Sequence, residues 1–88
     1  MKLGFLASHR GSNVQAVVDA CASGRLAAVP CVVISNHANA KVLGWAARQG
    51  IPHYHLSSTT HPDPVRLDGA ILDAVAGHDV ELVVLAGS

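Results

Sequence analysis

The stretch that decides the fold is residues 3–13, which read LGFLA followed by SHRGSN. The first five residues form a short apolar run that ends at turn-forming residues, which is typical of a buried β-strand. Residues 8–13 then lead into a segment with helical periodicity. A strand, a short loop with a glycine and a helix form the unit in which α/β proteins bind ligands at the carboxyl end of the strand. The stretch therefore predicts an α/β nucleotide-type fold with a ligand site on its first loop.

The next two elements follow the same alternation. Apolar residues spaced three and four apart predict a helix over residues 13–22, and Gly24 is the expected C-terminal cap. The unbroken run CVVI at 31–34 lies within a predicted strand over residues 29–35. Such a run lacks the alternation of a half-exposed strand, so it indicates a parallel strand that is covered on both faces.

The second half of the chain repeats the pattern. A second helix is expected from a cap at Asn39 to Gln49, and a third strand over residues 51–56, where Pro52 favours an edge position. Asp63-Pro64 predicts the start of a third helix. The apolar stretch LVVLA at 82–86 predicts a fourth strand. Four such steps imply a Rossmann-like parallel sheet with helices on both faces, truncated after the fourth strand.

Composition limits the partners that this chain can have. The 88 residues include six basic and six acidic ones, scattered along the sequence, and the formal net charge is zero. This balance removes the long-range attraction that nucleic-acid and anionic-membrane binders use. The apolar run at 3–7 is too short for a membrane span or the core of a signal peptide. Cys21 and Cys31 lie in apolar patterns and indicate core thiols of a cytoplasmic protein.

The loop at 8–13 carries the most informative chemistry. Gly11 tolerates a positive φ and allows a ligand to approach the backbone, and the following helix directs its free N–H groups at the loop. Ser12 and Asn13 can add side-chain hydrogen bonds to an anion. The alternative is that these three residues form only a turn and a helix cap, because serine and asparagine are favoured at that position.

The groups that the loop lacks narrow the ligand. No lysine follows the glycine to bind the outer phosphates of a nucleoside triphosphate, and only one of the three glycines of the dinucleotide motif is present. The best fit is a small phosphate monoester. His53 and His55 share one face of the third predicted strand, but no third ligand accompanies them, so no metal site is predicted.

Several motifs in order resemble the phosphoribosylglycinamide formyltransferase family of purine biosynthesis. They are Ser8-x-x-Gly11-Ser12-Asn13-x-Gln15-Ala16, Ser35-Asn36, Ala47-x-x-Gly50-Ile51 and Leu82-Val83-Val84-Leu85-Ala86-Gly87. The resemblance covers the whole chain and implies the N-terminal half of a formyltransferase domain. It implies that Gly11, Ser12 and Asn13 bind the phosphate of the ribonucleotide substrate.

The resemblance also implies the formyl donor, 10-formyltetrahydrofolate, which would enter a cleft at Leu85 and Gly87. The family can place a folate-contacting arginine where this chain has Pro64, and Arg66 is the nearest substitute. The catalytic asparagine, histidine and aspartate of the family are expected beyond Ser88, so the chain would need its own C-terminal half. The complete protein is expected to be a monomer or a homodimer.

Two other functions remain open at this stage. Formyltetrahydrofolate deformylase, a hydrolase, has a related core, and Ser35-Asn36-His37 and Gly50-Ile51-Pro52 suit either enzyme. The deformylase has no ribonucleotide to hold and usually carries an additional N-terminal domain, which favours the transferase. The second alternative is a phosphate-binding module without catalytic activity.

Overall fold

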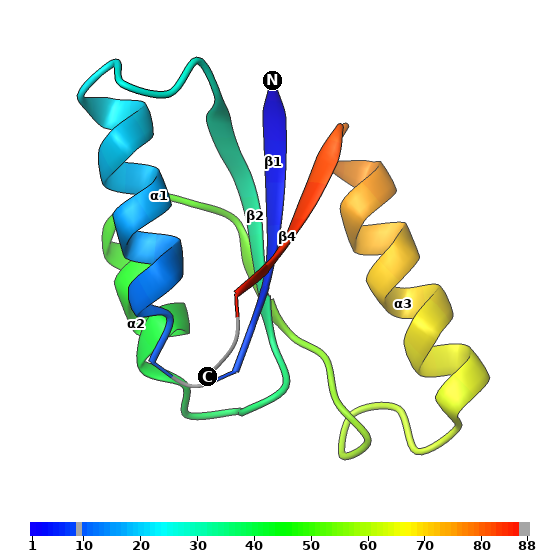
Figure 1. Ribbon diagram of the computed structural model, residues 1–88. Helices are drawn as coiled ribbons and strands as arrows, with labels where there is room; N and C mark the ends of the chain where they lie inside the picture. Colours follow the sequence, from blue (N-terminus) through cyan, green and yellow to red (C-terminus); the bar gives the residue numbers. More distant parts are fainter. Residues whose placement is uncertain (9, 87–88) are drawn as a thin grey trace.

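The computed structural model describes residues 1–8 and 10–86, and these form an α/β layered structure (Figure 1). The elements in chain order are β1 (Lys2–Ala7), α1 (Ser12–Ala22), β2 (Val29–Ser35), α2 (Lys41–Arg48), β3 (His53–His55), α3 (Pro64–Gly77) and β4 (Leu82–Ala86). The strands pair in the order β3-β2-β1-β4, and every pairing is parallel. Helices α1 and α2 cover one face of the sheet and α3 lies on the other. The predicted Rossmann-like fold is confirmed.

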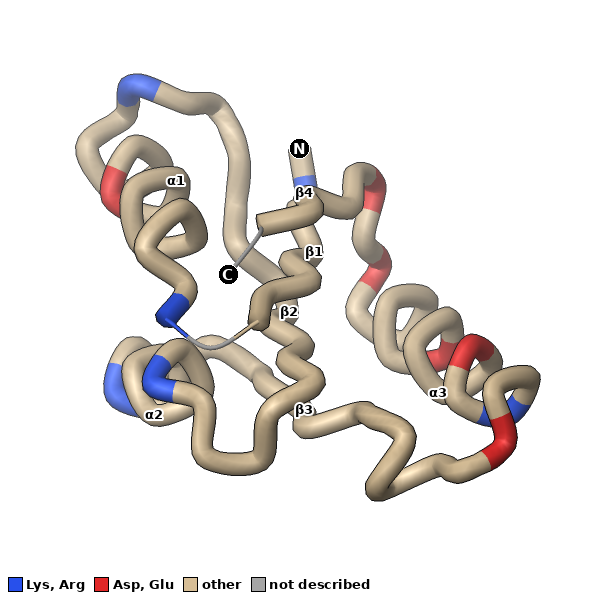
Figure 2. The backbone as a smooth tube through the Cα atoms, turned by 60° about the horizontal axis from the view of Figure 1, so that its bottom comes forward, with Lys and Arg blue, Asp and Glu red and all other residues tan. Residues whose placement is uncertain are grey.

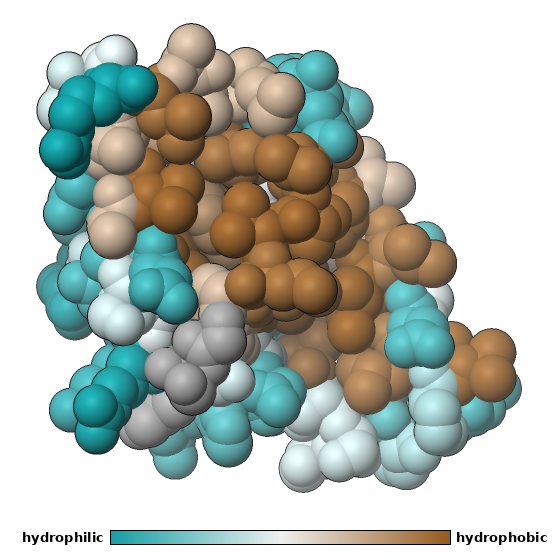
Figure 3. Space-filling model, in the orientation of Figure 1, coloured by the Kyte–Doolittle hydropathy of each residue, from teal (hydrophilic) through white to brown (hydrophobic). Residues whose placement is uncertain are grey.

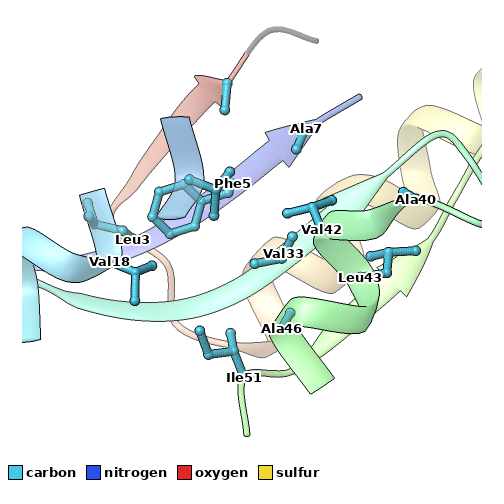
Figure 4. Packing of buried hydrophobic residues seen from close by; sticks show 12 residues of the cluster. Leu3, Phe5, Ala7, Val18, Val33, Ala40, Val42, Leu43, Ala46 and Ile51 are labelled. Carbon is cyan, nitrogen blue, oxygen red and sulfur yellow. The ribbon is translucent and has the colours of Figure 1, made fainter. Parts of the chain in front are cut away.

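The core lies between the sheet and the pair α1 and α2. Phe5 of β1 is 1% exposed and packs with residues from β2 and both helices (Figure 4). The predicted apolar face of α1 is confirmed, because Val14 and Val18 are buried and Val17 and Cys21 pack against the same cluster. Burial of these side chains is the main stabilising contribution to this layer.

The α3 side of the sheet is much less closely packed. No residue of α3 is fully buried, although its predicted face is half-buried. Leu72 of α3 and Leu85 of β4 are 67% and 78% exposed. Hydrophobic side chains gather over β4 and extend to α3 in the space-filling view (Figure 3). As expected for the fourth strand, one side of β4 pairs with β1 and its other side has no neighbouring strand among the residues described.

Most predicted boundaries agree with the structure. Gly24 and Gly50 have φ values of 80° and 72° and follow the C-cap residues of α1 and α2, Ser23 and Gln49, as helix-ending glycines do. The Asp63 side chain accepts a hydrogen bond of 3.0 Å from the Val65 N–H, and Pro64 opens α3. Among the described elements, β3 forms one edge of the sheet, as Pro52 indicated.

Three expectations need correction. Asn39 is not the cap of α2: the Ala40 N–H binds the His37 carbonyl in a turn, and Ala40 takes the cap position. Strand β3 spans three residues instead of six; it begins later than expected because the Ile51 N–H bonds to the Ala46 carbonyl of α2 and the Pro52 nitrogen has no hydrogen to donate. Cys31 is only half-buried, since an irregularity between Leu3 and Gly4 of β1 leaves it without a partner in the register. Both cysteines are free thiols.

The Asp63 cap can be tested through stability. Replacing Asp63 with alanine removes the acceptor for the Val65 N–H, so the free energy of unfolding of the full-length protein is expected to fall by about 1 kcal/mol. Asp63→Asn keeps an acceptor at the same position and serves as the control. Equal stability of the alanine and asparagine variants in chemical denaturation would show that the cap contributes nothing.

Candidate functional site

The candidate site lies at the edge of the sheet where the parallel strands end. Strands β1 and β2 finish at Ala7 and Ser35, and the helices that follow them, α1 and α2, begin on the same side of the sheet (Figure 1). In parallel sheets this edge collects the loops and the helix N-termini, which carry partial positive charge.

Gly11 lies where α1 and α2 meet at this edge. It is the N-cap of α1, is buried, and has a φ of 68°. A Cβ atom on it would lie 2.2 Å from Cγ2 and 2.5 Å from Cβ of Val42, which is the second residue of α2. The starts of α1 and α2 are therefore in contact, and only glycine fits between them. Gly11 uses the positive φ that glycine tolerates, and the packing against Val42 is a further requirement for glycine that the sequence did not indicate.

Ser12 and Asn13 are exposed in the first turn of α1. The Gln15 N–H donates to the Gly11 carbonyl at 3.0 Å, which is the first hydrogen bond of the helix. The N–H groups of residues 12–14 therefore have no acceptor within α1. Gly11 occupies the cap position and has no side chain that could bind these groups. Capping therefore does not occupy the side chains of Ser12 and Asn13, which leaves them available at the surface.

Two exposed cations flank the same region. Arg10 precedes the N-cap of α1, and Lys41 is the first residue of α2, whose N-cap Ala40 makes no side-chain cap bond. The acidic residues are not evenly scattered along the sequence: five of the six fall between 63 and 81, on and around α3. Basic residues lie mainly in the layer of α1 and α2 (Figure 2). This separation favours an anion on the α1 side of the sheet.

A hollow of about 290 Å³ opens at the same edge, on the α3 side. Its wall is mostly apolar and includes Leu85, with two residues that bear polar side chains, Ser8 and Asn36. The remaining lining residues are Leu6, Ala7, Ile34, Leu56, Ile71 and Ala86. Ser8 also begins the loop that ends at Gly11, so the hollow and the start of α1 are connected through one short segment.

Ser35 ties the ends of the strands together. Its side chain is fully buried, donates a hydrogen bond to the Ser8 carbonyl, and accepts one of 3.2 Å from the His37 N–H. Its own carbonyl accepts a 3.0 Å hydrogen bond from the Leu56 N–H, just after β3. One residue therefore connects the segments that follow β1, β2 and β3.

The other predicted residues fall into two groups. Arg66 does not line the hollow: its side chain is 83% exposed and lies 3.9 Å from the Asp63 carboxylate. His9 and Gly87 lie outside the described residues, so the expected cleft contact at Gly87 stays a prediction.

The histidines of β3 bond within their own segment. His53 Nδ1 lies 2.9 Å from the Ile51 carbonyl, and His55 Nε2 lies 2.9 Å from Ser57 Oγ. Within residues 1–8 and 10–86, no three histidine, cysteine, aspartate or glutamate side chains gather as a metal site would require. The same residues contain no helix that is long and apolar enough to span a bilayer.

Sequence reasoning identified the loop but not the residues that hold it. In the sequence, Ser35 lies at the end of a predicted strand and Val42 within a predicted helix. Each lies about 30 residues in sequence from the loop residue it contacts, Ser8 or Gly11. The available signal for Ser35 was a polar residue directly after three buried apolar ones, at the carboxyl end of a parallel strand. No local signal marks Val42.

The architecture and the site define the class: an α/β protein of the Rossmann-like type with its candidate site at the carboxyl edge of a parallel sheet. The formyl transferase family model matches residues 1–88. The chain belongs to the formyl transferase family.

Individual relatives agree with this assignment. Phosphoribosylglycinamide formyltransferase of Haemophilus influenzae is 37% identical over 86 residues, which are 98% of this chain and 41% of the relative. The structure of glycinamide ribonucleotide transformylase 1 from Symbiobacterium toebii matches with a TM-score of 0.91 and 36% identity, over 99% of this chain and 41% of that chain. The chain thus spans about two fifths of the length of these relatives.

The fold is shared with a hydrolase. A formyltetrahydrofolate deformylase from Pseudomonas putida has a TM-score of 0.86 and 23% identity, over 98% of this chain and 30% of that chain. At this identity the match supports the common fold and does not separate the two activities.

The contact between Gly11 and Val42 predicts a large stability effect. Gly11→Ala introduces a side chain at positive φ and forces Val42 aside, so unfolding of the full-length protein is expected to become easier by about 2–5 kcal/mol. Gly24→Ala is the matched control: its φ is also positive, but nothing lies within 4 Å, and about 1–2 kcal/mol is expected.

A double-mutant cycle isolates the contact. Val42→Gly should make the Gly11→Ala substitution less costly, because it removes both the Cγ2 atom at 2.2 Å and the Cβ atom at 2.5 Å from the new methyl group. Chemical denaturation of the four proteins measures this coupling. Equal costs for Gly11→Ala with valine or glycine at position 42 would show that the contact is not the constraint.

Proposed function

We propose that this chain forms the substrate-phosphate-binding part of a phosphoribosylglycinamide formyltransferase, an enzyme that transfers a formyl group from 10-formyltetrahydrofolate to the amine of phosphoribosylglycinamide. The observation that supports this most is the loop from Ser8 to Asn13. It leads into α1, its Gly11 contacts the start of α2, and Arg10 and Lys41 lie beside the two helix starts. Such a place suits a phosphate monoester. The relatives named for this reaction share 31–37% identity with the chain over nearly its whole length.

In the proposed reaction the substrate amine attacks the formyl carbon. The new carbon–nitrogen bond forms as the bond between that carbon and the folate nitrogen breaks, and one amine proton passes to the folate. Gly11, Ser12 and Asn13 would hold the phosphate through backbone N–H groups and the two polar side chains. Holding the phosphate orients the amine and lowers the entropic part of the barrier.

We place the formyl donor next to the exposed end of β4. Leu85 lines the hollow that connects with Ser8, so a donor at Leu85 and Gly87 would approach the ribonucleotide across the start of the loop. Arg66 is exposed at the start of α3 and is a weaker candidate for the donor's acidic groups, since it already lies beside Asp63. We expect the catalytic acid–base residues in a C-terminal half beyond residue 88, and we expect the enzyme to act in the cytoplasm as a monomer or homodimer.

The phosphate assignment predicts a selective loss of substrate affinity. In the full-length enzyme, Ser12→Ala and Asn13→Ala should each raise KM for phosphoribosylglycinamide about three- to tenfold, because each removes one hydrogen bond to an anion. Both side chains are exposed, so stability should change little. Gly11 variants are unsuitable for this test, because a side chain there meets Val42.

The control is KM for 10-formyltetrahydrofolate, which should stay at the wild-type value in both variants. An unchanged KM for the ribonucleotide would contradict the phosphate assignment. The products separate the alternative functions: formate released without formylated ribonucleotide would identify a deformylase, and ribonucleotide binding without turnover would identify a binding module.

A second test concerns the chain by itself. Residues 1–88 should transfer no formyl group, because we place the acid–base residues elsewhere, and should be poorly soluble because the side chains over β4 and α3 are exposed. Addition of a separately produced C-terminal half should restore activity in an assay of the folate product. Turnover by the 88-residue chain alone would refute this placement of the catalytic residues.

A further inference from the structure

Two buried contacts from one segment hold the loop at both of its ends. The Ser35 hydroxyl binds the Ser8 carbonyl where the loop leaves β1, and Val42 packs against Gly11 where the loop enters α1. Both contacts come from residues 35–42, which connect β2 to α2. The close view shows Ala40 and Val42 at the start of α2, and Ala7 at the end of β1 (Figure 4). The loop is therefore positioned by the neighbouring connection.

The two contacts constrain the loop in different ways. Val42 excludes side-chain volume at Gly11, which limits how closely the helix starts approach. The Ser35 hydrogen bond is directional and fixes where the Ser8 carbonyl lies. The same hydroxyl accepts a 3.2 Å hydrogen bond from the His37 N–H, so a residue of its own segment also fixes its position. With the Ser35 side chain fully buried, water cannot replace these bonds without rearrangement.

We propose that Ser35 is a positioning residue for substrate binding: through the Ser8 carbonyl it sets the path of the loop that presents Ser12 and Asn13. This inference rests on the proposed function, because it assigns Ser35 to the phosphate held by that loop. Ser35 does not touch the phosphate itself. Loss of the Ser35 hydroxyl removes no hydrogen-bond donor of α1, but it frees the loop that sets where Ser12 and Asn13 lie.

Ser57 provides a matched control within the same chain. It is also a buried serine near the end of a strand, two residues beyond β3, and its Oγ accepts the N–H of the residue two positions on, Thr59, at 3.2 Å. Its other bond goes to His55, in its own segment, at 2.9 Å. Both serines are thus buried and accept the N–H of the residue two positions on, and only Ser35 also bonds to the loop.

The experiment uses the full-length enzyme with Ser35→Ala, Ser35→Cys and Ser57→Ala. Ser35→Ala should raise KM for phosphoribosylglycinamide about fivefold, since one directional hydrogen bond is lost, and should change KM for 10-formyltetrahydrofolate less, because Ser8 alone among the described residues of this loop lines the hollow. Ser35→Cys keeps the volume with a weaker donor and should give an intermediate value, which also serves if the alanine variant folds poorly. Ser57→Ala should lower the melting temperature to a similar degree without changing either KM.

The outcomes separate this inference from the proposed function. If Ser12→Ala and Asn13→Ala raise KM for the ribonucleotide but the Ser35 variants do not, the positioning role is wrong and the phosphate assignment stands. If the Ser35 and Ser57 variants raise both KM values alike, Ser35 is only structural and the inference is again wrong. If neither Ser12→Ala nor Asn13→Ala changes KM for the ribonucleotide, the phosphate assignment fails and the role of Ser35 fails with it.

Discussion

The contact between Gly11 and Val42 is the constraint on which the arrangement of the site depends. Because Gly11 has no Cβ, the first turns of α1 and α2 can approach closely, and two helix N-termini lie next to each other. Each terminus contributes partial positive charge, and neither has a side-chain cap that would neutralise it. The positive φ of Gly11 is the backbone conformation that makes the approach possible. The surface that we propose for an anion thus arises from packing in the core as much as from the residues that face solvent.

Most of the fold could be predicted from the sequence because its signals are local. Helix periodicity, the Asp63-Pro64 start and the glycines that end α1 and α2 each depend on residues within one or two turns. The unbroken apolar run in β2 identified a strand covered on both faces, and Val32, Val33 and Ile34 are all buried. The prediction failed where a turn competed with a cap: Asn39 is a good capping residue, but the bond from Ala40 to His37 places it in the turn before α2.

The candidate site could be predicted only in part, for a reason of distance along the chain. The loop residues were found because they follow a buried strand directly. The contacts that hold the loop come from Ser35 and Val42, 27 and 31 residues away from Ser8 and Gly11, and depend on the pairing of β1 with β2. No pattern within either segment encodes that pairing. The acidic residues already cluster between 63 and 81 in the sequence, and the fold places that segment on the face of the sheet opposite α1 and α2.

The unequal packing of the two faces has a consequence for how the chain opens. Strands β1 and β2 with α1 and α2 share the closed core, whereas α3 has no fully buried residue and is held by half-buried side chains and a 2.7 Å hydrogen bond between Tyr54 and His78. Segments with few buried contacts open at lower free energy than the core does. Amide hydrogens of α3 should therefore exchange with solvent through local opening, while those of β1 and β2 exchange only when the whole layer unfolds. We therefore expect the layer of β1, β2, α1 and α2, which carries the loop, to unfold as one cooperative unit.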